Sequence, residues 1–276
     1  MCPNCRAFVE GGSKVCEYCG AEMGAPSWKR AQAFERAAVA GSLLERLQST
    51  TGILLLINLG LFAATMVTTI RYVPDAAGSL SIDGRVLEMF GGKFGPVIFR
   101  YGEWWRLVTA GFLHGGVFHI LMNMWVISDL GAQVEQIYGT SRYLVIYLLS
   151  SIAGFALSLW WAPYSLSIGA SAAACGLLGA MMAFGRLSGS DFIWKFYLRW
   201  AVMLIVIGFM PGFHIDNAAH IGGLAGGFGI GYIAYNAHIS ESGESFWKGA
   251  AVVCVLLTAF SMYKAYMMIA SRLFSE

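Results

Sequence analysis

Long apolar segments alternate with short polar ones along most of this chain. A helix needs about 20 predominantly apolar residues to cross the hydrocarbon core of a bilayer. Segments that meet or approach this length predict seven transmembrane helices, at 52–70, 107–128, 143–162, from about 167, at about 196–210, in the segment that follows 214–217, and at 250–270. The pattern therefore predicts an all-α, polytopic membrane protein.

The composition agrees with this fold class. The chain is 57% hydrophobic and 12% charged, against about 25% charged residues in a soluble domain. A net charge of +2 without a long basic run gives no reason to expect a nucleic-acid partner. The first residues include cysteines and lack an apolar core of the signal-peptide type, so we expect no cleavable signal sequence.

Positive charge before the first predicted span indicates the orientation of the chain. By the rule that cytoplasmic segments carry the excess of lysine and arginine, the N-terminus should be cytoplasmic. Later loops support this only weakly. The residues on which the assignment rests are Arg6, Lys14, Lys29, Arg30, Arg36 and Arg46.

Four cysteines near the N-terminus form two Cys-x-x-Cys pairs: Cys2, Cys5, Cys16 and Cys19. Each pair can offer two thiolates to one tetrahedral ion, and the segment is too short to build a core of its own. We therefore expect residues 1–24 to be a zinc ribbon with a structural Zn²⁺, and this module could bind a protein partner. Disulfide or redox chemistry is the alternative reading, and iron is a second candidate metal. Four thiolates leave no open position for catalysis.

Two polar stretches flank the first predicted span. Residues 25–49 have the amphipathic pattern of a linker helix that could lie on a membrane surface. Residues 71–103 are too polar to span a membrane, and they end at Trp104, Trp105 and Arg106. Because tryptophan favours the headgroup level, we expect an interfacial loop that its aromatic residues anchor.

A serine and a histidine in two apolar segments suggest chemistry. Ser171 lies among small residues in IGASAAACGLLG, and His220 lies in NAAHIGGLAGG. Small residues at helix interfaces are usually a packing feature, whereas an ionisable side chain inside a membrane usually marks a functional site. If the glycines that follow His220 allow its helix to contact the Ser171 helix, the pair could act as nucleophile and base.

The second predicted span carries His114, His119 and Asn123. His119 and Asn123 are four residues apart and share one helix face, so they could donate hydrogen bonds to one developing oxyanion. A polar contact between helices is the simpler alternative. A zinc site at His114 and His119 would lack the glutamate of a metalloprotease helix, and we expect a structural role for His114.

Taken together, the motifs resemble those of the rhomboid intramembrane serine proteases over about residues 50–238. The residues that carry the resemblance occur in the family's order, and they are Trp105, Arg106, His114, His119, Asn123, Gly131, Glu135, Gly169, Ser171, Ala172, Ala219, His220, Gly223 and Gly227. The resemblance implies a six-helix core over 50–238, with residues 239–276 adding a seventh helix.

The same resemblance implies a function. Ser171 would be the nucleophile and His220 the general base of a dyad without an acid, with no catalytic cofactor. His119, Asn123 and the Ser171 N–H would form the oxyanion hole, and Trp105, Arg106 and Glu135 would be structural. Substrates would be transmembrane segments of mainly single-pass proteins. The site would face outward, in a bacterial inner membrane. Cys175, where relatives often have an aromatic residue, and Ala172, where they often have glycine, depart from the pattern.

Two other functions fit parts of the sequence. A catalytically inactive relative could bind membrane proteins as an adaptor, but such proteins usually lose Ser171 or His220. A transporter could use the histidines as an ion path, but few other intramembrane charges are present. Asp216, four residues before His220, is a weak candidate for a third catalytic residue because we expect it at the water-facing end of its helix.

Overall fold

The computed structural model describes residues 2, 7, 9, 15–20, 49–73, 80–210, 215–236 and 241–273, although not the side chains of 241, 242 and 273. These residues form α-helices and one 3₁₀ turn, without an extended strand in the described ranges, which confirms the all-α prediction. The long helices are α3 (Thr50–Tyr72), α7 (Val117–Tyr138), α8 (Thr140–Trp161), α9 (Ser171–Leu187), α10 (Asp191–Gly208), α11 (Asn217–Asn236) and α12 (Glu241–Leu273). The short ones are α4 (Gly84–Met89), α5 (Gly95–Tyr101), α6 (Arg106–Thr109) and the 3₁₀ turn η2 (Ala110–Phe112).

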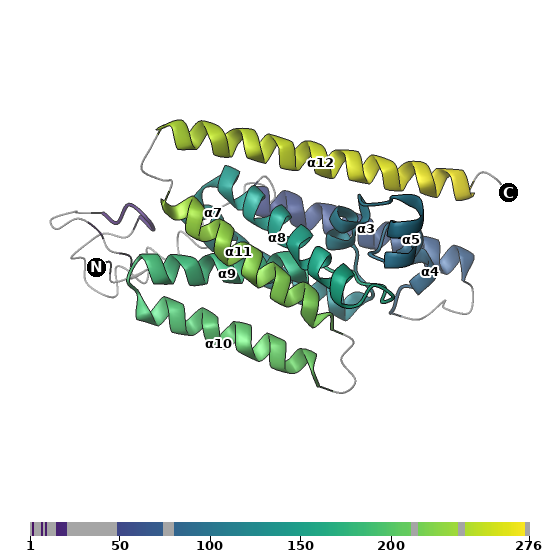
Figure 1. The fold of residues 1–276 in the computed structure, drawn as a ribbon, viewed down its shortest axis with the longest axis horizontal. Helices are drawn as coiled ribbons and strands as arrows, with labels where there is room; N and C mark the ends of the chain where they lie inside the picture. The colour runs from purple at the N-terminus through teal and green to yellow at the C-terminus, as the bar shows by residue number, and fades with distance from the viewer. Residues whose placement is uncertain are drawn as a thin grey trace.

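Helix α9 is the centre of the bundle. Every residue from 172 to 185 is buried, and α7, α8, α10 and α11 all pack against this helix. Figure 1 shows α10 and α12 on opposite sides of the bundle, with α8, α9 and α11 between them. A short helix that is buried all round has no amphipathic face, which explains why its sequence is almost entirely small or apolar.

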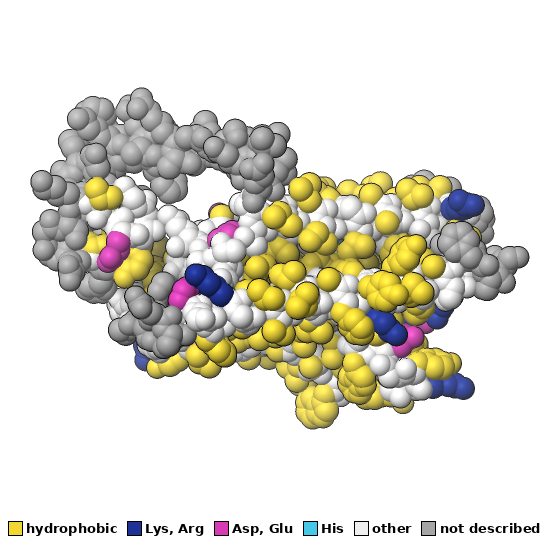
Figure 2. All heavy atoms as spheres, turned by 90° about the horizontal axis from the view of Figure 1, so that it is seen from above, with side chains coloured by type: hydrophobic (Ala, Val, Ile, Leu, Met, Phe, Trp, Pro, Cys, Tyr) yellow, Lys and Arg dark blue, Asp and Glu magenta, His cyan; other side chains and the backbone are white. Residues whose placement is uncertain are grey.

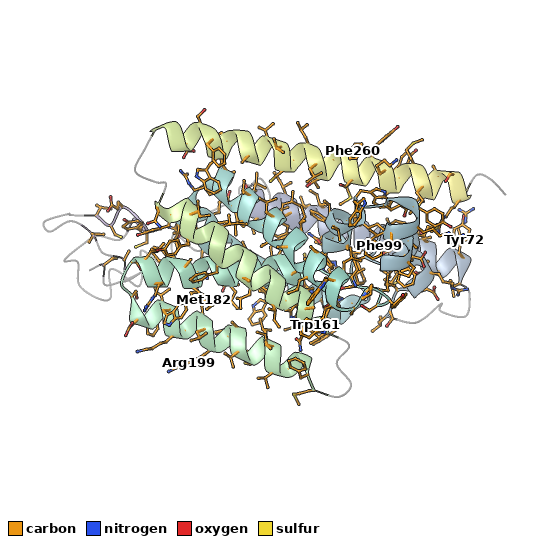
Figure 3. All side chains as sticks on the ribbon, viewed as in Figure 1. Tyr72, Phe99, Trp161, Met182, Arg199 and Phe260 are labelled. Carbon is orange, nitrogen blue, oxygen red and sulfur yellow. The ribbon has the colours of Figure 1, made fainter. Side chains whose placement is uncertain are left out.

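The outside of the bundle suits a lipid environment. Among the described residues, four helical segments are long and apolar enough to cross a membrane, namely α3, α7, α8 and residues 243–272 of α12, and α9 is an apolar but shorter helix. Large apolar side chains such as Val253, Leu256 and Phe260 are exposed along α12, and Figure 2 shows hydrophobic side chains gathered over the right-hand part of this face. In Figure 3, Phe260 on α12 and Arg199 on α10 point away from the bundle.

Two predicted spans begin too early. The second does not start at 107, because residues 106–112 form α6 and η2, and the long helix α7 starts at Val117. The fourth starts at Ser171 rather than near Ser167. Gly169 has a φ of 126°, which no residue of a right-handed helix adopts, so the helix can begin only after it.

The loop over residues 80–103 is folded rather than irregular, since it contains α4 and α5. Arg106 is fully buried and holds this loop, donating to the backbone oxygens of Glu88 at 2.5 Å and Gly92 at 3.1 Å and to Glu103 Oε2 at 2.6 Å. Trp104 is 54% exposed, whereas Trp105 is only 8% exposed. An interfacial anchor in this loop therefore stays a prediction for Trp104, while Trp105 packs inside the protein.

Helix α12 is attached to the bundle near both of its ends. Arg142 Nη1 on α8 donates to Glu244 Oε2 at 2.6 Å, and its guanidinium lies over the ring of Trp247. Near the other end, Arg106 Nη2 lies 3.5 Å from the sulfur of Met268. The boundary predicted between residues 238 and 239, and most of the linker predicted at 25–49, lie outside the described residues.

The N-terminal cysteine segment contacts the bundle. Ala7 is buried in the main apolar cluster, and Tyr18 packs against that cluster. The Tyr18 hydroxyl hydrogen-bonds Tyr235 on α11, and burial together with Tyr235 raises the pKa of Tyr18. The segment is therefore in contact with the helix that carries His220.

Candidate active site

Ser171 is the first residue of α9. The turn before it is fixed by Gly169, whose N–H donates to the Ala110 oxygen of η2 at 2.9 Å. The first N–H groups of a helix have no partner within the helix, and the helix dipole is positive there. Negative charge that develops beside Ser171 would therefore be stabilised.

His220 lies in the first turn of α11, facing Ser171. Its Nε2 is 2.9 Å from Ser171 Oγ, and the residue is 7% exposed. This distance is within the range for a nucleophile and its base. The structure thus brings together two side chains that the sequence places on separate apolar segments.

Glycines allow the close approach of α9 and α11. A Cβ added at Gly223 would overlap the carbonyl of Ala172, and one added at Gly227 would overlap the carbonyl of Gly176. On the other side of α11, a Cβ at Gly154 of α8 would lie 2.5 Å from the Ala219 oxygen. Because α11 meets its neighbours through backbone, its position relative to Ser171 is closely defined.

His119 lies beside the Gly169 turn. Its Nδ1 accepts a hydrogen bond from the Gly115 N–H at 3.3 Å, so the ring proton of the neutral side chain is on Nε2. A Cβ at Gly169 would lie 2.8 Å from that Nε2 and 3.4 Å from Ser171 Oγ. Glycine at 169 therefore leaves open the space between the His119 donor and the serine.

The other two residues of this cluster make local contacts. Asn123 Nδ2 donates to the His119 backbone oxygen at 2.8 Å, one turn earlier in α7. His114 is fully buried, and its ring packs edge-on against His119 with centroids 5.1 Å apart. His114 thus supports the ring of His119 by contact.

Asp216 is not placed as a third catalytic residue. Its carboxylate accepts hydrogen bonds from the hydroxyls of Ser158 and Ser167 and, at 3.0 Å, from the Ala219 N–H. Within the described residues, His220 Nδ1 has no hydrogen-bond partner. Asp216 caps α11 instead, a role that our sequence analysis missed although Asp is a preferred N-cap residue.

Glu135 connects three helices at the opposite end of α7. Its two carboxylate oxygens accept from Thr140 Oγ1 at 2.9 Å and from Thr51 Oγ1 at 3.3 Å. These residues belong to α8 and α3. Glu135 lies far along α7 from His119, at the end where α8 begins, so its contacts are structural.

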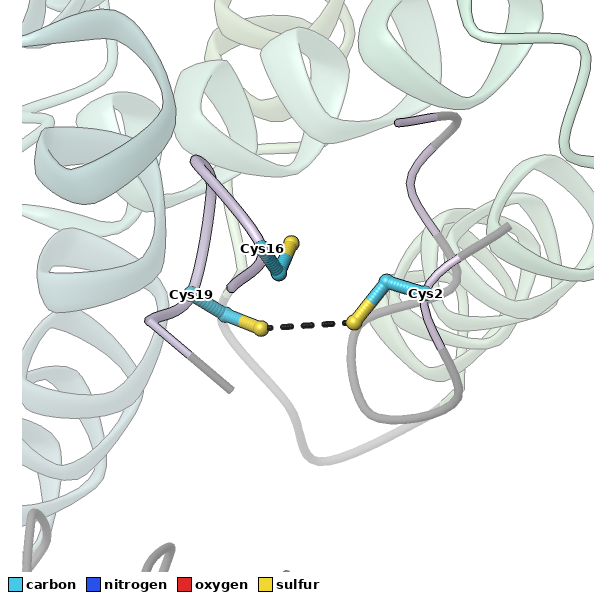
Figure 4. A group of neighbouring side chains, drawn as sticks. All are labelled: Cys2, Cys16 and Cys19. Atoms are coloured by element: carbon cyan, nitrogen blue, oxygen red, sulfur yellow. Dashed lines mark hydrogen bonds between the residues drawn. The ribbon is translucent and has the colours of Figure 1, made fainter. Parts of the chain in front are cut away.

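Three of the four predicted metal ligands lie together (Figure 4). The Sγ atoms of Cys2, Cys16 and Cys19 are all within 4.8 Å of one another, and those of Cys2 and Cys19 are 3.6 Å apart. Such spacing is compatible with thiolates around one tetrahedral ion. Cys5 lies outside the described residues.

The comparisons with known proteins agree on one family. Residues 101–237 match the family model described as the Rhomboid domain. The chain is 39% identical over 151 residues to rhomboid protease GluP of Bacillus subtilis, covering 54% of this chain and 29% of GluP. It is 29% identical over 207 residues to rhomboid-like protease 3 of Toxoplasma gondii, covering 71% and 78% of the two chains.

A plant relative is similar over a stretch of comparable length. The chain is 36% identical over 152 residues to RHOMBOID-like protein 4 of Arabidopsis thaliana, covering 53% of this chain and 38% of the relative. The chain therefore spans well under half the length of GluP and of this plant protein. Residues 101–237, which match the family model, contain every residue from Trp105 to Gly227 that is discussed above.

Proposed function

Because this chain belongs to the rhomboid family, we propose that it is an intramembrane serine endopeptidase that cleaves membrane-embedded segments of other proteins. The observation that carries the proposal is the 2.9 Å separation of His220 Nε2 and Ser171 Oγ. A serine hydroxyl is a weak nucleophile until a base removes its proton. His220 is in position to do so.

The proposed reaction is acyl transfer in two steps. Ser171 Oγ attacks the peptide carbonyl carbon while His220 Nε2 takes the hydroxyl proton, and the proton then passes to the leaving amine as the C–N bond breaks. A water molecule, deprotonated by His220, next attacks the acyl ester and releases Ser171. The dyad needs no third residue and no cofactor in this scheme.

The oxyanion would be held at the Gly169 turn. The Nε2–H of His119 and the hydroxyl of Ser171 border the space that Gly169 leaves open. The N–H of Ser171, the first of α9, would be the second donor. Donors fixed in advance around a developing negative charge supply a large part of the rate enhancement of such enzymes. Asn123 would join them by turning its amide away from the His119 carbonyl, or would act by fixing the local backbone.

The substrate would be a transmembrane segment, mainly of single-pass proteins, that enters from the lipid and unwinds locally to expose its carbonyl. The surplus of basic residues before α3 supports a cytoplasmic N-terminus. Ser171, at the opposite end of the bundle from Glu135, would then face the outer side. We place the protein in a bacterial inner membrane on this scheme.

The competing function is that of an inactive relative that binds membrane proteins. A fluorophosphonate separates the two, since Ser171 Oγ would displace fluoride from phosphorus while His220 takes the proton. We expect the purified protein in detergent to be labelled, and Ser171→Ala and His220→Ala to lose the label. A folded wild-type protein that is not labelled would favour the inactive binding function.

We further propose that the cysteine segment binds one structural Zn²⁺ through Cys2, Cys5, Cys16 and Cys19. The spacing of the three described thiols supports it. Metal analysis of the purified protein should give one zinc per chain, which Cys16→Ser with Cys19→Ser abolishes. Cys254→Ser, a change in the buried thiol of α12, is the matched control. Iron at the same stoichiometry, or no metal in the wild type, would contradict the zinc assignment.

A further inference from the structure

Lys93 is a buried cation with no role in the reaction described above. It follows α4 in the loop over residues 80–103, and its exposed fraction is 0%. Its Nζ donates to the backbone oxygens of Ala162 at 3.0 Å, Ser165 at 3.1 Å and Ser158 at 3.5 Å, and to Ser165 Oγ at 3.3 Å. A lysine is rarely fully buried unless such partners surround it.

Two of these acceptors belong to the C-terminal end of α8. Ser158 is in the last turn and Ala162 is the C-cap residue, so their carbonyl oxygens lie at the negative end of the helix dipole. The ammonium group stabilises this end of α8. It also fixes the chain that leaves the helix, because Ser165 contributes two of the contacts.

The backbone of Lys93 holds the segment that leads to the nucleophile. Its N–H donates to the Ser167 oxygen at 3.0 Å, and its oxygen accepts from the Ser167 N–H at 2.9 Å, forming an antiparallel bridge. Ser167 precedes Gly169 and Ser171 by two and four residues. The side chain of Lys93 thus hydrogen-bonds Ser165 and its main chain hydrogen-bonds Ser167, both in the segment between α8 and α9.

Asp216 holds the other side of this loop and the start of α11. Its carboxylate accepts from Ser158 Oγ, Ser167 Oγ and the Ala219 N–H, and its backbone oxygen accepts from the His220 N–H at 3.1 Å. Burial alone would raise the pKa of Asp216, but the hydrogen bonds and the charge of Lys93 lower it. Burial lowers the pKa of Lys93, which the charge of Asp216 opposes.

Ser158 therefore connects the two charges, because Lys93 Nζ contacts its backbone oxygen and its hydroxyl donates to Asp216. Ser167 connects Asp216 to the main chain of Lys93, since its hydroxyl donates to Asp216 and its backbone forms the bridge with Lys93. At one end of this network, Ser167 is two residues before Gly169. At the other end, the backbone oxygen of Asp216 accepts from the His220 N–H. Within the described residues, neither charged side chain hydrogen-bonds Ser171 or the His220 ring.

We propose that Lys93 is a positioning residue, which together with Asp216 sets the Ser167–Ser171 segment against the first turn of α11 so that Ser171 and His220 stay in hydrogen-bond contact. This inference rests on the proposed dyad. It assigns the buried cation to the chemical step rather than to substrate binding, because the Nζ contacts lie at the end of α8 and in the segment after it that leads to Ser171.

The test is the inactivation of full-length protein in detergent by a fluorophosphonate at several concentrations, which separates the maximal rate from the half-saturating concentration. Lys93→Met keeps an unbranched side chain, one atom shorter, without the ammonium group. We expect the maximal rate to fall about 100-fold, as for a misplacement of about 1 Å, with the half-saturating concentration unchanged. Lys93→Arg, which can donate to the same oxygens, should recover most of the rate.

Lys195→Met is the matched control, because Lys195 is exposed on α10 and pairs only with the nearby Asp191 in the described residues; it should react like the wild type. Asp216→Asn serves if Lys93→Met does not fold, since Asn keeps an acceptor for the Ala219 N–H but loses acceptors for the serines. A wild-type rate in folded Lys93→Met, or an equal fall in both kinetic constants, would overturn the proposal.

Backbone amide hydrogen exchange separates this inference from the proposed function. In the folded Lys93→Met protein we expect faster exchange at residues 165–172 and 216–220 and unchanged exchange at the α3 and α12 segments. If exchange rises in this way but the wild type is never labelled, the protease assignment fails and the positioning role stands. If the wild type is labelled and exchange does not change, the positioning role fails alone.

Discussion

The Cα of Gly227 on α11 lies directly against the backbone of Gly176 on α9, so that an added Cβ would overlap the Gly176 carbonyl. Gly223 and Ala172 make the same kind of contact one turn nearer to the dyad. The separation of Ser171 and His220 is therefore set by backbone contact between two helices. Interhelical contacts in membranes commonly use small residues in this way.

Gly227→Ala should force α11 away from α9. Overpacking of this kind costs about 1–3 kcal/mol, and the displaced helix would carry His220 away from Ser171. We expect a lower melting temperature in detergent and loss of most fluorophosphonate labelling. Gly229→Ala is the control, because Gly229 is on the same helix with no atom within 4 Å of the added Cβ. Full labelling of Gly227→Ala would show that the helices can separate without harm.

His119→Ala tests the oxyanion donor. Removal of one such donor lowers the chemical rate by about 100- to 1,000-fold, because the developing charge loses a hydrogen bond. The concentration of fluorophosphonate that gives half-maximal rate should not change. Asn123→Ala should have a smaller effect, since its amide donates to the His119 carbonyl in this structure. If Asn123→Ala proves the more harmful change, Asn123 rather than His119 is the principal donor.

Gly169→Ala should inactivate the site for two separable reasons. An L-residue at a φ of 126° is strained, and the new Cβ would lie 2.8 Å from His119 Nε2. Gly102→Ala isolates the first reason, since Gly102 also has a positive φ, 68°, but no atom within 4 Å of an added Cβ. We expect both variants to lose stability and Gly169→Ala alone to lose labelling. Equal labelling of the two would mean that the space beside His119 is not used.

Much of this arrangement could be read from the sequence, and the part that could not depends on tertiary contacts. Long apolar segments predict the helices, and the small-residue motifs around Ser171 and His220 suggest that these two helices meet. The start of α9 at Ser171 depends on the positive φ of Gly169, which the sequence pattern alone does not specify. The sequence predicts only an interfacial loop around Lys93, because a lone lysine between glycines carries no sign of the carbonyls that surround it. The sequence also does not predict α4 and α5, because the loop that contains them is held by tertiary contacts such as those of Arg106.

Glu244→Ala tests the attachment of α12. Arg142 is 3% exposed and Glu244 41% exposed, so the change leaves a buried guanidinium without this carboxylate. A hydrogen bond to a charged group contributes about 1.5–3 kcal/mol, and the partial exposure of Glu244 reduces that to about 1 kcal/mol. We expect a lower melting temperature with little change in labelling. Ser245→Ala, at an exposed neighbouring position, should be neutral, and a neutral Glu244→Ala would mean that α12 is held by its apolar contacts.

Acid should weaken the Lys93–Asp216 network in a defined window. The pKa of Asp216 is lowered from its ordinary value of 3.8 in the folded protein, so its carboxylate stabilises the fold at pH values above 3.8. That contribution is lost as the pH falls from 3.8 through the folded-state pKa, because protonation removes acceptors for Ser158 and Ser167. The melting temperature in detergent should therefore fall more steeply with acid in the wild type than in Asp216→Asn, which lacks the titrating group. Asp191→Asn, at an exposed position on α10, should follow the wild-type curve. Parallel curves for the wild type and Asp216→Asn would show that the charge of Asp216 does not stabilise the folded state.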